Sequence, residues 1–202
     1  YNRISRDLEA MIIQQPPRSG KSQLGSVFFP AWILGRHPNW EIISASYSAS
    51  LAISFSRQVR ATMRSDEFKS IFRDVKLDDE TQSAEGWKTT KGGGYLPVGV
   101  GGPATGRGAH VLTIDDPVKN AEEAESETTR EAIKDWYRTT AYTRLAPGGG
   151  VIVIQTRWHL DDLAGWLEAQ SGSGDGDKFE IVRYPMIATE DEKYRLKGEV
   201  LH

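Results

Sequence analysis

Short apolar runs separated by helical patterns are the feature that most constrains the fold of this chain of 202 residues. The runs span residues 11–13, 41–47, 111–114 and 151–154 and are rich in β-branched side chains. Because they are too brief for helices, we predict that they form buried strands. Strands that alternate with helices predict an α/β domain with a mainly parallel central sheet and helices on both of its faces.

Helices are predicted where apolar residues recur at intervals of three and four. One follows Ser48, whose hydroxyl is suited to cap a helix N-terminus. The three stripes are Leu51, Phe55, Val59 and Met63; Ile133, Trp136, Tyr137, Thr140 and Ala141; and Leu160, Leu163, Ala164 and Leu167. Residues 86–102 contain two short extended pieces around a triple glycine, which predicts an antiparallel hairpin added to the sheet.

Composition excludes several classes of protein. No apolar run is long enough to cross a bilayer, so we expect no membrane partner. The absence of cysteine removes disulfides, thiolate metal sites and cysteine nucleophiles, and it suits a reducing cytosol. The formal net charge is −3, but residues 1–73 carry ten Lys and Arg against five Asp and Glu. A nucleic-acid partner is therefore not excluded, because a few local basic groups can bind phosphates.

A phosphate-binding loop is indicated by Gly20-Lys21-Ser22, which follows the first predicted strand and opens a helix. Such a loop needs inward-facing backbone N–H groups, a helix N-terminus, a lysine that reaches the β- and γ-phosphates and a hydroxyl for Mg²⁺. Gln15 stands where the usual pattern has its first glycine. The alternative is an ordinary turn at a helix start, but the strand before and the helix after favour a site for ATP and Mg²⁺.

Two carboxylates end the third apolar run, as Asp115-Asp116-Pro117. An acidic residue at the carboxyl end of a buried parallel strand lies where ligands bind, and there Asp115 could hold Mg²⁺ together with Ser22. Asp116 could orient the attacking water, with Glu122 or Glu123 as alternatives. The simpler interpretation is a pair of carboxylates that cap a turn, but the phosphate-binding loop upstream favours an NTPase.

The sequence resembles the N-terminal packaging ATPase domain of the large terminase subunits of tailed bacteriophages. The similar segments are PPRSGKS at 16–22, FPAWILGRHP at 29–38, ASYSASLA at 45–52, GGGYLPVGVGGPATGRGAHVLTIDDPVK at 92–119, DWYRTTAYTRL at 135–145 and IQTRWHLDDLAGWL at 154–167. The resemblance implies an ATP-driven motor that moves double-stranded DNA through a portal protein into a procapsid in the host cell cytoplasm. It also implies a small terminase subunit as partner and a homo-oligomeric ring, built from a chain that can be monomeric in solution.

The resemblance also assigns site residues. Phosphates are expected to contact the Walker A loop, namely Pro17, Arg18, Ser19, Gly20, Lys21 and Ser22. The Walker B strand corresponds to 111–116, with Asp116 where many relatives have Glu. Thr156 and Arg157 correspond to a motif that couples hydrolysis to movement, although they could instead cap a strand end. Arg107 resembles an arginine finger given to a neighbouring subunit; the alternatives are a loop arginine paired with an acid, or Arg18 acting within its own subunit.

The fold class that we expect is a P-loop NTPase of the additional-strand, conserved-acid (ASCE) type. We expect an ATPase motor domain at 1–170. Residues 171–202, which begin with SGSGDGD, should form a connector and the C-terminal end of the ATPase domain, leading toward a nuclease domain outside this chain. Nuclease activity is not expected, and part of the family's N-terminal region should lie upstream. The alternatives are a helicase-like or other DNA-dependent P-loop ATPase, and a nucleotide-binding assembly module that does not hydrolyse.

Overall fold

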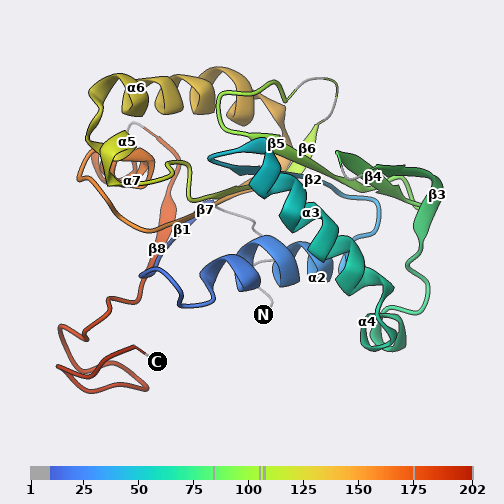
Figure 1. The fold of residues 1–202 in the computed structure, drawn as a ribbon, viewed down its shortest axis with the longest axis horizontal. Coiled ribbons are helices and arrows are strands. Elements are labelled where there is room, and N and C mark those ends of the chain that lie inside the picture. Colours follow the sequence, from blue (N-terminus) through green and yellow to red (C-terminus); the bar gives the residue numbers. More distant parts are fainter. Residues whose placement is uncertain (1–9, 84, 105, 107, 175, 202) are drawn as a thin grey trace.

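The computed structural model describes residues 10–83, 85–104, 106, 108–174 and 176–201. Within them, one sheet runs in the order β3-β4-β5-β2-β6-β7-β1-β8 (Figure 1). The strands are β1 (Ala10–Gln14), β2 (Glu41–Ser46), β3 (Leu77–Ser83), β4 (Gly86–Thr89), β5 (Gly94–Gly99), β6 (Ala109–Asp115), β7 (Leu145–Gln155) and β8 (Phe179–Arg183). The helical elements are η1 (Gln23–Phe28), α2 (Phe29–Arg36), α3 (Ala49–Arg64), α4 (Asp66–Ile71), α5 (Ala121–Glu125), α6 (Glu127–Trp136), η2 (Tyr137–Ala141), η3 (Tyr142–Arg144) and α7 (Leu163–Ser173).

Strand pairing confirms the mainly parallel sheet. The pairs β5–β2, β2–β6, β6–β7, β7–β1 and β1–β8 are parallel, and β4 is antiparallel to both β3 and β5. The strand that carries Asp115 is not next to the strand that leads into Gly20-Lys21-Ser22, because β7 lies between them. This inserted strand is the additional strand of the expected class.

Both faces of the sheet are covered, as the continuous apolar runs predict (Figure 1). In β2, Ile42 packs in a cluster with residues of α2 and α3, whereas Ile43 packs with residues of α6 and α7 on the opposite face. Adjacent residues of β6 divide in the same way, Val111 to the first cluster and Leu112 to the second. No helix in the described ranges is long and apolar enough to span a bilayer.

The antiparallel hairpin is confirmed as β4 and β5, but the sheet extends further than the sequence predicts. A Cβ on Gly93 would lie 2.4 Å from the carbonyl oxygens of Pro38 and Trp40, so the hairpin passes too close to this backbone for any side chain there. The outer strand β3 has a polar sequence, LDDETQS, that hides it from a search for apolar runs. The edge strand β8 was not predicted either, and β7 begins at Leu145 rather than at Val151.

The predicted helix after Ser48 is confirmed, since the Ser48 hydroxyl accepts a hydrogen bond from the Leu51 amide. The helix predicted from Leu160 begins later. Asp162 caps α7 by accepting from the Gly165 amide, and Leu160 lies outside the helix with 89% of its surface exposed. Residues 171–173, expected in the connector, form the last turn of α7, which ends at Gly174 in the left-handed conformation.

Candidate active site

The loop between β1 and η1 is shaped by residues with unusual backbone angles. Arg18 and Gly20 are left-handed, with φ of 62° and 79°. Ser19 Oγ donates to the Gln15 side chain at 3.0 Å and to the Pro16 carbonyl at 2.9 Å, so Gln15 closes the loop at the position where the usual pattern has glycine. Left-handed residues in a turn build the concave amide surfaces that bind anions. The loop therefore has the form expected of a phosphate cradle.

Asp115, at the carboxyl end of β6, is surrounded by serine hydroxyls. Ser22 Oγ donates to Oδ1 at 3.2 Å, Ser26 Oγ donates to Oδ2 at 2.8 Å, and Ser46 Oγ donates to the Asp115 carbonyl at 2.9 Å. The predicted pair of Ser22 and Asp115 is thus in contact. Ser26 was missed, although its position four residues after Ser22 places both hydroxyls on one face of a helix.

Burial controls the charge of Asp115, which is 1% exposed. Removal from water raises the pKa of its carboxyl group to about 6, and the neighbouring Asp116 charge acts in the same direction. The hydrogen bonds from Ser26 and Ser22 and the charge of Lys21 oppose the rise. A cation that bound beside Asp115 would therefore favour its ionised form.

Asp116 is held between the phosphate-binding loop and the end of β7. Its Oδ2 accepts from Lys21 Nζ at 2.7 Å and its Oδ1 accepts from the Thr156 amide at 2.8 Å. The backbone is left-handed, with φ of 42°, and the Asp116 amide donates to the Ile154 carbonyl. This conformation turns the short side chain toward both partners. Asp116 is thus the point where the loop, β6 and β7 meet.

Thr156 and Arg157 follow β7 and face different surroundings. Thr156 Oγ1 donates to the Gln15 carbonyl at 3.4 Å, beside the loop. The Arg157 guanidinium is turned to the start of α7, where it pairs with Asp162 at 2.9 Å and Glu168 at 3.5 Å.

Not every predicted site residue joins this cluster. The structure brings together Lys21, Ser22, Asp115, Asp116 and Thr156 and leaves the Arg157 guanidinium outside them. Glu122 and Glu123 lie on α5, where the Glu123 carboxylate accepts from the Lys119 amide. Arg107 lies outside the described residues.

The donor set near Asp115 fits Mg²⁺ in the form that nucleotides carry it. Carboxylate and hydroxyl oxygens are ligands for this ion, which usually takes one or two protein carboxylates and completes its shell with phosphates and water. Among the described residues, no group of three or more His, Cys, Asp and Glu could hold a metal ion by itself. One carboxylate and one hydroxyl suit a metal that arrives with phosphate.

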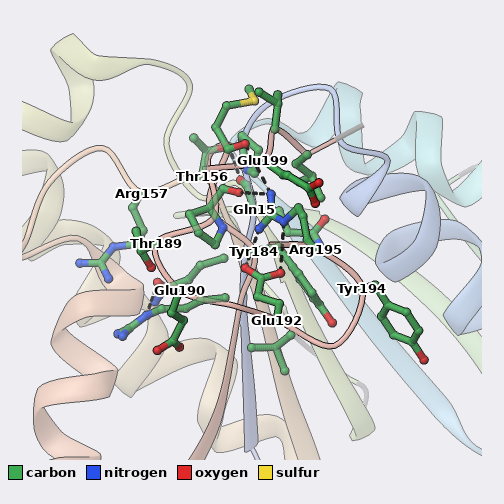
Figure 2. Close-up of a pocket in the computed structure, with 18 of the residues that line it drawn as sticks. Gln15, Thr156, Arg157, Tyr184, Thr189, Glu190, Glu192, Tyr194, Arg195 and Glu199 are labelled. Atoms are coloured by element: carbon green, nitrogen blue, oxygen red, sulfur yellow. Dashed lines mark hydrogen bonds and ion pairs between the residues drawn. The ribbon is translucent and has the colours of Figure 1, made fainter. Parts of the chain in front are cut away.

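A cavity of about 1670 Å³ opens beside the loop (Figure 2). Gln15, Pro16, Pro17 and Thr156 form one side of it, and the segment after β8, residues 184–201, forms the other. That segment is held in shape by Arg195, which is 9% exposed and bonds the Glu192 carboxylate and the Pro185 carbonyl. The cavity was not predicted, because its far wall has no regular apolar pattern.

Comparison with solved structures identifies the fold. The HK97 bacteriophage large terminase is similar with a TM-score of 0.57 and 17% identity, over 92% of this chain and 36% of that one. The large terminase ATPase domain of Thermus phage P74-26 matches with a TM-score of 0.51 and 13% identity, over 76% of this chain and 62% of that one. The large terminase of another thermophilic bacteriophage has a TM-score of 0.50 and 13% identity, over 89% and 40%. The chain is a P-loop NTPase fold, spanning about a third of the length of the HK97 protein.

Sequence comparison assigns the family. No curated protein matches the chain. A family model described as the N-terminal part of the terminase large subunit, T4likevirus-type, matches residues 12–202. The match includes the loop, Asp115, Asp116 and the end of β7. The chain therefore belongs to the family of T4-like-virus-type terminase large subunits, as part of their N-terminal region.

Proposed function

We propose that this chain hydrolyses ATP at the edge of the sheet where the loop, β6 and β7 meet, and that hydrolysis drives double-stranded viral DNA into a procapsid. The observation that carries the proposal is the contact of Ser22 with Asp115 beside that of Lys21 with Asp116. Metal-binding and water-orienting carboxylates are thereby placed next to a phosphate cradle. Membership of the terminase family supports the packaging role.

Each residue has a distinct task in this proposal. Lys21 and the amides of residues 17–22 hold the β- and γ-phosphates, while Ser22 and Asp115 hold Mg²⁺. The bound ion would neutralise charge that develops on the phosphates. When a phosphate takes Lys21, Asp116 loses one partner but keeps the Thr156 amide, which leaves Oδ2 free to orient the attacking water. Asp116 thus changes partner as nucleotide binds.

The nucleoside part of ATP would extend into the cavity of Figure 2. Gln15, Pro16 and Pro17 belong to both the loop and the cavity wall, so a bound triphosphate has this space beside it. Tyr184 offers a partly exposed ring there. Replacement of Tyr184 by Ala should weaken the binding of ATP and leave that of inorganic triphosphate unchanged. Equal losses for both ligands would contradict this placement.

Coupling would pass through residues 156–162. Thr156 holds Asp116 at one end of this loop, and near the other end both carboxylate oxygens of Asp161 accept from Lys134 Nζ on α6 at 2.7 Å. Arg157 and Asp162 hold the loop to α7. A shift of Asp116 is therefore connected to two helices by polar contacts. Thr156 acts through its amide and Arg157 by keeping the loop in shape.

The remaining parts of the proposal concern other molecules. Arg107 completes the site of an adjacent subunit in a homo-oligomeric ring on the procapsid, with the portal protein and the small terminase subunit as partners in the host cytoplasm. Residues 1–170 form the motor domain and 171–202 its C-terminal end. The pairing of β8 with β1 supports the inclusion of the later residues in the same sheet.

The experiment that tests the proposal is phosphate release from ATP. Lys21→Ala and Asp115→Ala should abolish it, while Ser44→Ala should not, because Ser44 Oγ is buried on the same sheet and has no partner among the described residues. Translocation of intact duplex without strand separation would distinguish a packaging motor from a helicase. Turnover that both active-site variants retain would exclude this site.

A further inference from the structure

Ser26 is a buried partner of Asp115 that lies one helical turn beyond the phosphate-binding loop. Its side chain is fully removed from solvent, and its Oγ donates to Asp115 Oδ2 at 2.8 Å. Ser22 donates to the other oxygen, Oδ1, at 3.2 Å. The two carboxylate oxygens are therefore divided between two serines, and the shorter hydrogen bond is the one farther along the helix.

The helix reaches Asp115 because it lies close to β7. Residues of η1 are wound as a π-helix, in which the Phe29 amide bonds the Leu24 carbonyl. Gly25 permits the approach, since a Cβ there would lie 2.1 Å from Cδ1 of Ile154, which is itself fully buried. The next residue is Ser26. Local widening into a π-turn often occurs at functional sites, and here it accompanies the contact with β6.

The division of oxygens fixes the orientation of the carboxylate. A carboxylate turns readily about its terminal torsion, because that torsion has broad minima. A buried carboxylate also needs hydrogen bonds to offset the loss of water. Ser26 supplies such a bond to Oδ2, and Ser46 holds the Asp115 carbonyl. Oδ1 is left facing Ser22, on the side where the loop lies.

We propose that Ser26 is a positioning residue that fixes the Asp115 carboxylate so that Oδ1 and the Ser22 hydroxyl face the same Mg²⁺. The inference rests on the proposed function, because it requires Asp115 to hold the metal of a bound nucleotide. Ser26 itself touches neither metal nor nucleotide. Its replacement should therefore alter the dependence on Mg²⁺ more than the binding of nucleotide alone.

The test is a titration of Mg²⁺ at fixed mant-labelled ATP, followed by fluorescence. For Ser26→Ala, the Mg²⁺ concentration at half-maximal binding should rise about tenfold, as expected for the loss of one hydrogen bond to a charged group. Binding of mant-ATP in EDTA should stay within about twofold of wild type. Ser26→Thr, which keeps a hydroxyl, should restore much of the Mg²⁺ response. Ser44→Ala is the matched control.

Two further variants keep the test decisive. Ser26→Cys retains the volume of the side chain but is a poor donor, so it should reproduce the shift even if Ser26→Ala does not fold. Gly25→Ala should shift the same midpoint by pushing the helix from Ile154. A wild-type Mg²⁺ midpoint in folded Ser26→Ala or Ser26→Cys, beside a raised one in Ser22→Ala, would overturn the inference alone. Equal nucleotide binding by wild type and Lys21→Ala would overturn the proposed site as well.

Discussion

The ammonium group of Lys21 and the carboxylate of Asp116 form an ion pair, with 2.7 Å between Nζ and Oδ2. Both groups are largely withdrawn from solvent, with 7% of the Lys21 side chain and 27% of the Asp116 side chain exposed. A phosphate that binds Lys21 must compete with this carboxylate. The free protein therefore keeps the charge of its phosphate-binding lysine neutralised.

Asp116→Asn should bind nucleotide more tightly and hydrolyse it more slowly. Loss of a partly buried ion pair is worth about 1–2 kcal/mol, which corresponds to about a tenfold gain in affinity for phosphates that replace it. Hydrolysis should fall at least about 100-fold, because the water loses its orienting carboxylate. Titration with mant-ATP and single-turnover phosphate release measure the two effects. Asp135→Asn, on an exposed pair, is the control; an unchanged affinity for Asp116→Asn would contradict competition.

Asp115→Asn should make the nucleotide-free protein more stable at neutral pH. Burial raises the pKa of Asp115 from 3.8 to about 6 in the folded state. At 1.36 kcal/mol for each pH unit, ionisation of the folded carboxyl lowers the free energy of unfolding by about 3 kcal/mol. The amide has no such cost. Urea denaturation of both proteins without Mg²⁺ measures the difference.

The pH dependence of that difference has a definite sign. Below about pH 4 Asp115 is protonated in both states, so its ionisation contributes nothing. Between pH 4 and 6 the unfolded state releases its proton first, so wild type loses stability relative to Asp115→Asn as pH rises. Above about pH 6 the difference should be constant. A difference that grows as pH falls would show that the folded carboxyl is not destabilised by burial.

The contact between Lys134 and Asp161 should be required for coupling. Lys134 is 3% exposed, so a double-mutant cycle with Lys134→Met and Asp161→Asn should give an interaction of about 1–2 kcal/mol in the free energy of unfolding. Either variant should retain most ATP hydrolysis and lose packaging efficiency. The exposed pair of Lys69 and Asp66, at 4.0 Å, should give a value near zero. Parallel losses of hydrolysis and packaging would argue against a coupling role.

Arg107 should act across the interface between subunits. We expect a mixture of Arg107→Ala and Asp116→Ala subunits to regain part of the ATPase activity that each lacks alone. Some interfaces in the mixture combine an intact arginine with an intact carboxylate. Phosphate release from assembled rings measures the recovery, and unmixed variants serve as controls. If no activity returns at any ratio, the arginine serves its own subunit.

The polar site could be foreseen in part because its residues stand at the ends of apolar runs. Gly20-Lys21-Ser22 and Asp115-Asp116 follow predicted strands, and parallel strands bring their carboxyl ends to one edge. The ion pair of Lys21 with Asp116 could not be foreseen, because it depends on the left-handed backbone at Asp116. The Arg157 guanidinium is equally a matter of tertiary structure, since Asp162 and Glu168 compete for it.

The fold could be foreseen where burial imposes a pattern. The strands β1, β2, β6 and the buried end of β7 have apolar residues on both faces, and these were predicted. The edge strands β3 and β8 are mostly exposed or half-buried, so their sequences carry little apolar signal. Their formation depends on hydrogen bonds to neighbours that a local pattern does not reveal.

The polar sequence of β3 also protects the molecule. This strand ends the sheet and is paired on one side only, to β4. An open strand edge is a template on which another chain can add a strand. Asp78, Asp79 and Glu80 place three negative charges along it, so two copies that met edge to edge would repel each other. The acids that conceal β3 in the sequence thus guard the sheet against unwanted growth.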